Sequence, residues 1–96
     1  MSDPLNPQTL DETVQMDGTI GSVAVDSVGN PTVILWITDE TTNVVHQMNG
    51  SLDTDAVASL GMLQLLRDAV QSASRVRVRY TTGGEGAKWF HLVRIL

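Results

Sequence analysis

The sequence contains no cysteine among its 96 residues. This absence excludes disulfide cross-links, zinc sites with Cys ligands, iron–sulfur clusters and catalytic thiols. Long hydrophobic runs are also absent, since no apolar stretch approaches the roughly 18 residues of a membrane-spanning helix. Residues 1–16 lack the basic and apolar regions of a signal peptide. We therefore expect a cytoplasmic protein that makes no membrane contact.

Positive charge is missing from the first two thirds of the chain. Residues 1–66 contain nine acidic residues and no Lys or Arg, whereas residues 67–96 contain six basic and two acidic residues. The formal net charge of −5 therefore averages an acidic segment and a basic one. A net negative charge disfavours a general polyanion binder, but cations concentrated near one end of the chain can still form a local binding surface.

The length fits one compact domain, and the texture of the sequence changes near residue 18. Residues 1–17 are polar and contain two prolines, and Asn6 and Pro7 form a possible helix start. We expect an N-terminal tail or short helix over residues 1–17. Residues 18–96 are predicted to form a single small β-barrel domain.

Short β-rich runs separated by turn signals follow this segment. Residues 19–26, 32–38 and 42–48 are predicted strands, and the turn at Asp39 makes the second and third a hairpin. Asp53 is a suitable N-cap for a helix that continues to about Ser72. Residues 75–80 and 89–96 are predicted to form a second hairpin, joined by a glycine-rich loop.

This order of elements, β-β-β-α-β-β, predicts a mainly β protein with the architecture of a small five-stranded OB-like antiparallel barrel. In that architecture the helix lies between strands 3 and 4, and the barrel belongs to the OB-fold class of closed β structures. An SH3-like barrel with an inserted helix, or a β-grasp-like α+β sheet, would give nearly the same order. No sequence motif distinguishes these folds here.

An arginine strand is the sharpest functional feature of the sequence. Arg75, Arg77 and Arg79 alternate with apolar residues, so three guanidinium groups lie on one face of the strand. Such a row is suited to a phosphate backbone, to stacking on bases, or to an acidic protein surface. The alternative is a charged edge strand whose arginines pair with carboxylates of the same chain.

Aromatic residues join this face only in one of two hairpin registers. If Tyr80 pairs with Phe90, Trp89 and His91 lie on the arginine face, which then resembles a surface for stacking bases. If Tyr80 pairs with Trp89, Phe90 and Leu92 lie there instead, because a slip of one residue exchanges the two faces.

Two further residues are candidates for binding. Lys88, at the end of the glycine-rich loop, is a candidate contact for a nucleic acid or other partner. Trp36, in the second predicted strand, is either covered by another element or anchors a binding surface.

The predicted helix has two apolar stripes, and a single small barrel needs only one. The stripe expected to cover the barrel consists of Ala56, Leu60, Leu63, Leu66 and Val70.

The second stripe lies on nearly the opposite side of the helix and consists of Ala58, Met62, Leu65 and Ala69. Its alternating four- and three-residue spacing suits packing against another helix, which predicts a homodimer. The alternative is a set of exposed apolar residues of the kind that monomers tolerate.

Catalysis and metal binding have little support in the sequence. His46 and His91 are the only histidines, and neither has motif spacing to a nucleophile or to other metal ligands. The glycine-rich loop does not match a phosphate-binding loop, because Trp89 follows Lys88 where Ser or Thr is required. We expect no enzyme activity, no metal and no cofactor.

Two hypotheses for the function follow. The first is a non-catalytic binding or assembly module that acts through protein–protein contacts and self-associates through the second helix stripe. The second is an OB-like single-stranded nucleic-acid-binding protein that uses the arginine strand, Lys88 and a stacking tryptophan. Exposure of Trp89 distinguishes them, because an exposed Trp89 beside the arginines favours ligand binding.

Overall fold

The computed structural model contains the five predicted strands and the predicted helix in the predicted order. It describes residues 14–28, 31–52 and 56–96, without the side chains of residues 56–58. The elements are β1 (Val14–Asp26), β2 (Thr32–Asp39), β3 (Val45–Ser51), α1 (Ala56–Ser72), β4 (Arg75–Thr82) and β5 (Lys88–Ile95), with a 3₁₀ turn at Gly84–Gly86. Asp53, the predicted helix cap, lies outside the described residues.

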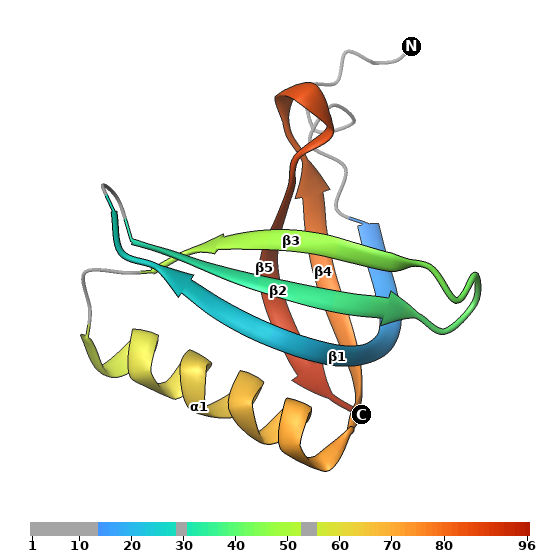
Figure 1. The fold of residues 1–96 in the computed structure, drawn as a ribbon, viewed down its shortest axis with the longest axis horizontal. Helices are drawn as coiled ribbons and strands as arrows, with labels where there is room; N and C mark the ends of the chain where they lie inside the picture. The colour runs from blue at the N-terminus through green and yellow to red at the C-terminus, as the bar shows by residue number, and fades with distance from the viewer. Residues whose placement is uncertain (1–13, 29–30, 53–55) are drawn as a thin grey trace, which may run out of the picture.

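The strands close into a barrel in the spatial order β1-β2-β3-β5-β4. All pairs are antiparallel except β3 with β5, which is parallel and consists of one register pair, Asn49 with Trp89. The first three strands form a meander, and β5 lies between β3 and β4 (Figure 1). This connectivity confirms the OB-like barrel and excludes an open β-grasp sheet.

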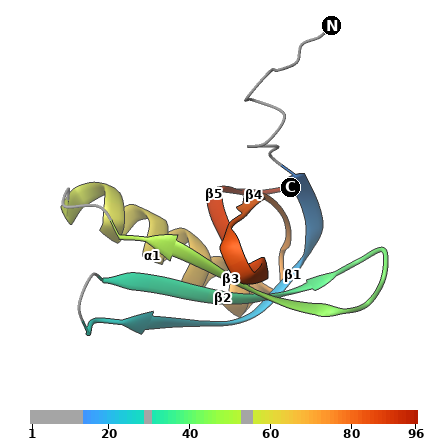
Figure 2. The ribbon, with the colours of Figure 1, turned by 90° about the horizontal axis from the view of Figure 1, so that it is seen from above.

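Strand β1 is long and bends between two neighbours, so that it belongs to both layers of the barrel. Its first half pairs with β4 and its second half with β2, with a register shift between Ile20 and Ser22. In Figure 2 the β1–β2–β3 layer lies on one side, and both α1 and the β4–β5 hairpin lie on the other. The bend allows one strand to close the barrel.

Strand β1 also begins earlier than the sequence predicted. It starts at Val14 rather than Thr19, so residues 14–17 belong to the barrel. The inward positions here are Met16 and Gly18. Only Met16 is a large apolar residue, so the alternation of apolar and polar residues is too weak to identify a strand from the sequence. The tail or short helix predicted for the residues before Val14 lies outside the described part of the chain.

The β2–β3 hairpin has a longer turn than predicted. Trp36 pairs with Gln47 and Ile37 with His46, and β3 begins at Val45 rather than at the predicted residue 42. The turn is held by the Asp39 carboxylate, which accepts a hydrogen bond from the Thr41 N–H at 2.8 Å. Asn43 takes a positive φ of 62°, which Asn tolerates better than most residues.

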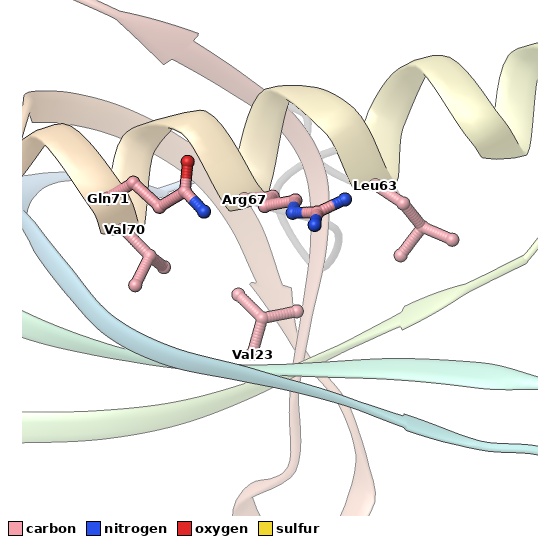
Figure 3. A pocket seen from close by; sticks show the side chains of 5 residues that line it. All are labelled: Val23, Leu63, Arg67, Val70 and Gln71. Carbon is pink, nitrogen blue, oxygen red and sulfur yellow. The ribbon is translucent and has the colours of Figure 1, made fainter.

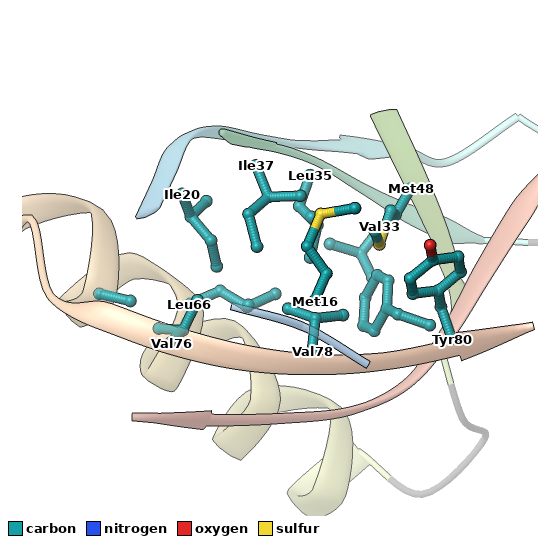
Figure 4. Packing of buried hydrophobic residues seen from close by; sticks show 12 residues of the cluster. Met16, Ile20, Val33, Leu35, Ile37, Met48, Leu66, Val76, Val78 and Tyr80 are labelled. Carbon is teal, nitrogen blue, oxygen red and sulfur yellow. The ribbon is translucent and has the colours of Figure 1, made fainter. Parts of the chain in front are cut away.

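The core lies inside the barrel and is built from the inward positions of all five strands (Figure 4). Strand β2 shows the alternation best, because Val33, Leu35 and Ile37 are fully buried between partly exposed neighbours. The buried hydrophobic residues in the described part of the chain are Met16, Ile20, Val33, Leu35, Ile37, Met48, Leu66, Ala69, Val76, Val78, Tyr80 and Phe90.

Helix α1 closes one end of the barrel, and its buried face differs from the predicted one. Leu66 and Ala69 are fully buried, whereas Leu60 is 57% exposed. The face that packs on the barrel therefore runs between the two predicted stripes rather than along the first. Ala69, which we assigned to an outward stripe for self-association, lies in the core.

A close contact between Gly50 and Phe90 completes the barrel beside the β3–β5 pair. A Cβ atom added to Gly50 would lie 2.6 Å and 2.8 Å from the Cε1 and Cε2 atoms of Phe90. These separations are shorter than real Cβ contacts, so the ring occupies the space that a side chain at residue 50 would need. Glycine at this position therefore allows Phe90 to fill the junction.

We expect Gly50→Ala to lower the free energy of unfolding by about 1–3 kcal/mol, because the added methyl group overpacks the core against Phe90. Gly61→Ala is the matched control, since a Cβ at this helical position meets nothing within 4 Å. It should raise stability by about 1 kcal/mol through helix propensity. Urea unfolding measures both, and an unchanged midpoint for Gly50→Ala would contradict the contact.

Candidate functional site

The outer surface of β2, β3, β5 and β4 gathers both tryptophans on one side of the barrel. Trp36 lies opposite Gln47, and Ile34 lies opposite Asn49. Asn49 in turn lies beside Trp89, which is paired with Thr81. We call these outward residues the tryptophan face, and they are Ile34, Trp36, Gln47, Asn49, Thr81 and Trp89.

Trp89 is the most accessible aromatic side chain of this face. It is 37% exposed, whereas Trp36 is only partly exposed. A Cβ atom on Gly83 would lie 3.5 Å from Cδ1 and 3.6 Å from Nε1 of Trp89, so the pyrrole edge of the indole rests against the β4–β5 loop. That loop is closed by a hydrogen bond from the Gly83 N–H to the Ala87 carbonyl at 2.7 Å. The loop thus supports an indole that stays partly open to solvent.

The register of the last hairpin combines features of both predicted alternatives. Tyr80 pairs with Phe90, as the first register requires, but Arg79 then pairs with Leu92 across a β-bulge. Phe90 is consequently buried, while Trp89 and Leu92 are both exposed. The extra residue, His91, lies close to Thr81, with 2.8 Å between Nε2 and the Thr81 Oγ1.

Two of the three predicted binding arginines are engaged within the protein. Arg75 donates two hydrogen bonds to Glu40, from Nε and from a terminal nitrogen, both at 2.7 Å. Arg77 does the same to Asp17, at 2.8 and 3.0 Å. Arg75 also lies 3.5 Å from Asp17, so the four residues form one cluster. Pairing with the chain's own carboxylates was the alternative interpretation of the arginine strand.

The cluster shifts the ionisation of its members. Hydrogen bonding by Arg77 lowers the pKa of Asp17, and hydrogen bonding by Arg75 lowers the pKa of Glu40. The same contacts raise the pKa values of the two guanidinium groups. Because each bond favours the charged forms, the cluster ties β1, β4 and the β2–β3 turn together at neutral pH.

Arg79 and Lys88 differ from the engaged arginines. Arg79 is exposed, and no carboxylate of the described residues forms an ion pair with either cation. Arg79 shares the outward side of β4 with Thr81. Lys88 is two residues before the buried Phe90, so both residues are on the same side of β5. Lys88 therefore lies at the end of the barrel, beside the tryptophan face rather than on it. Lys88 precedes Trp89 on β5, and Arg79 lies two residues from Thr81, the register partner of Trp89.

The helix residues predicted for self-association do not form an outward face. Ala69 is fully buried, and Met62 and Leu65 are partly buried against the core cluster. The side chain of Ala58 is outside the described part of the structure. Self-association itself stays a prediction.

Three hollows border the helix. One lies between α1 and β1, with a volume of about 290 Å³, and is lined by Val23, Leu63, Arg67, Val70 and Gln71 (Figure 3).

Two other hollows lie between α1 and β5. They have volumes of about 240 and 320 Å³ and share Met62, Phe90 and His91. The smaller of them also contains Trp89, so it adjoins the tryptophan face.

The sequence did not identify the polar members of the tryptophan face. Asn49 and Ser51 belong to β3, although the Asn-Gly-Ser run resembles a strand-ending turn. Gln47 joined the face only through the longer turn, and Thr81 through an extension of β4 that we assigned to the loop. Period-two alternation would have placed Gln47 and Asn49 on one side had the strand been extended.

Other site types find no support in the described residues. No group of three or more His, Asp or Glu side chains there could hold a metal ion. The same part of the chain contains no helix with the length and hydrophobicity to cross a membrane. The expected cytoplasmic location and lack of enzyme activity stay predictions.

The chain was compared with protein-family models, curated protein sequences and solved structures, and none of the three comparisons found a match. Function is therefore inferred from the barrel and from the geometry of its side chains.

We expect the Asp17 cluster to make stability depend on acidic pH. A carboxylate whose pKa is lowered on folding stabilises the protein above the pKa of the unfolded chain, and this contribution is lost as the pH falls through the lower folded value. Asp17→Asn should therefore be less stable than the wild type at neutral pH, and the difference should shrink as the pH falls through the acidic range. Urea midpoints at neutral and at strongly acidic pH measure it. An equal difference at both would mean that the charge of Asp17 is not what stabilises the cluster.

Proposed function

We propose that the protein binds single-stranded nucleic acid across the tryptophan face. One observation carries this proposal: an exposed Trp89 lies on the outer surface of an OB-type barrel, in register with Asn49 and Thr81, and Arg79 shares the outward side of β4 with Thr81. The strand 2–3 face and the β4–β5 loop are the surfaces with which OB-folds bind oligonucleotides.

Stacking supplies the first part of the binding. Trp36 and Trp89 lie on β2 and β5, with β3 between them, so their backbones are two strand spacings apart across the sheet and two residues apart along it, or roughly 12 Å. This separation lets each indole contact a different base. Every base has a π-face, so stacking of this kind tolerates different sequences.

Hydrogen bonding and charge supply the rest. The amides of Gln47 and Asn49 lie between the two indoles and can both donate to and accept from base edges. None of the six residues of the tryptophan face is acidic, although Glu85 lies in the neighbouring β4–β5 loop. Arg79 and Lys88 are the candidate phosphate contacts in this proposal.

The pairing of Arg75 and Arg77 with carboxylates changes the salt dependence that we expect for binding. Three arginines and Lys88 would have given affinity with a steep dependence on salt, whereas the geometry leaves Arg79 and Lys88 for phosphates. For single strands the logarithm of the affinity falls by about 0.7 per neutralised phosphate for each logarithmic unit of salt. Two contacts thus predict a shallow slope of about −1.4.

The protein-contact module is not the function that the geometry supports best. Its motivation was an outward helix stripe, and Ala69 of that stripe is in the core. The exposed Trp89 is the feature that distinguished ligand binding from protein contacts.

We expect fluorescence anisotropy to show saturable binding of a labelled oligo-deoxythymidine of about 12 nucleotides at low salt. Trp89→Ala should weaken binding by about tenfold or more, because one base loses its stacking partner. Arg79→Gln should weaken binding and make the salt slope shallower by about 0.7.

Arg67→Gln is the matched control, because Arg67 is also exposed but lies on α1, away from the tryptophan face. It should leave affinity and slope unchanged, and circular dichroism checks that each variant is folded. The proposal fails if the wild type shows no saturable binding, or if Arg67→Gln and Arg79→Gln have equal effects.

A further inference from the structure

A wedge opens next to Trp89 where β3 and β5 separate. The two strands meet only at Asn49 and Trp89, and beyond this pair they diverge. The space between them is a cavity of about 240 Å³ that also reaches α1. Its lining residues are Gly50, Ser51, Met62, Trp89, Phe90 and His91.

Two strand edges face each other across this wedge. The edge of β3 that faces away from the wedge pairs with β2 through Gly50 and Ser51. The edge of β5 that faces away from the wedge pairs with β4 through Phe90. Successive residues of a strand direct their N–H and C=O groups to opposite edges, so some of these groups point into the wedge. The register of β3 with β5 is limited to Asn49 and Trp89, so past this pair the two edges form no continuous ladder.

The side chains add an apolar floor and a polar rim. Phe90 is 6% exposed and packs on Gly50, and Met62 contributes from the helix. Ser51 brings a hydroxyl group. One nitrogen of His91 is taken by Thr81, which leaves the other for a ligand. Small-molecule sites likewise combine apolar side chains with a few polar groups that fix the orientation of the ligand.

We infer that this wedge holds a single nucleobase of the bound strand, a specificity site that rests on the nucleic-acid function proposed above. The wedge shares Trp89 with the tryptophan face, so a strand lying on that face passes its mouth. Sites for drug-sized ligands measure about 300–1,000 Å³, and the smaller wedge suits one heterocycle rather than a whole nucleotide. None of its lining residues is a carboxylate, and Lys88 precedes Trp89 at the end where a phosphate would lie.

The base in the wedge differs from a base that merely stacks. A stacked base presents only its ring face, whereas a base in the wedge also presents its edge to backbone groups and to Ser51. Binding should therefore be most sensitive at one nucleotide position, and the preferred base should be the one whose edge matches the available donors and acceptors.

The test combines an abasic scan with a variant that fills the wedge. Oligo-deoxythymidines of about 12 nucleotides, each lacking one base, are titrated against the wild type, Ser51→Leu and Ser72→Leu. Ser51 is exposed at the wedge, so leucine fills the cavity without entering the core. Ser72 is exposed at the end of α1 and lines none of the three hollows, which makes Ser72→Leu the matched control.

For the wild type and Ser72→Leu, we expect one abasic position to weaken binding by about tenfold. Ser51→Leu should bind the intact oligonucleotide about tenfold more weakly than the wild type does. Removal of the base at the sensitive position should not weaken the binding of this variant further. If Ser51→Leu behaves as the wild type while Trp89→Ala binds weakly, the wedge is not a base site although the protein binds nucleic acid. If the wild type binds none of the oligonucleotides, both the proposed function and the wedge site are wrong.

Discussion

The barrel closes through one parallel pair, Asn49 with Trp89, and through the Phe90 ring that fills the space over Gly50. This closure determines the rest of the surface. Because Phe90 must point inward, its neighbour Trp89 must point outward, where the β4–β5 loop supports it. Because the pairing stops there, β3 and β5 diverge and leave a wedge. A stacking platform and an adjoining cavity are thus consequences of how the core is sealed.

The charges of the molecule divide between structure and binding. Arg75 and Arg77 form bidentate contacts with Glu40 and Asp17 and hold β1, β4 and the β2–β3 turn together. Arg79 continues the same alternation but has no carboxylate partner among the described residues. An acidic protein can therefore keep a locally neutral to basic surface, because its carboxylates neutralise particular arginines rather than the whole arginine face.

The order of elements and the barrel could be predicted from the sequence, because turn signals and period-two runs mark four of the strands well. The register could not, since it depends on loops and bulges that apolar alternation does not report. The bulge at Arg79 places both Trp89 and Leu92 on the outside, which neither regular register allows. The longer turn after Asp39 changes the neighbours of Trp36 in the same way.

The buried face of the helix also could not be predicted from the sequence. Two apolar stripes fit a helical wheel equally well, and only the tilt of α1 across the barrel decides that Leu66 and Ala69 are both buried. The carboxylate partners of Arg75 and Arg77 could not be predicted for a related reason. Asp17 precedes the first predicted strand and Glu40 lies in a turn, so nothing local connects them to residues on β4.

The most direct test of nucleic-acid binding at the tryptophan face is a titration of the ¹⁵N-labelled protein with unlabelled oligo-deoxythymidine, followed by two-dimensional NMR. Binding at this face predicts shifts of the Trp89 indole N–H and of the amides of Gln47, Asn49 and Thr81, with the Arg67 amide on α1 unmoved. Trp36→Phe identifies the Trp89 indole signal. Shifts confined to α1, or no shifts at saturating oligonucleotide, would contradict the account.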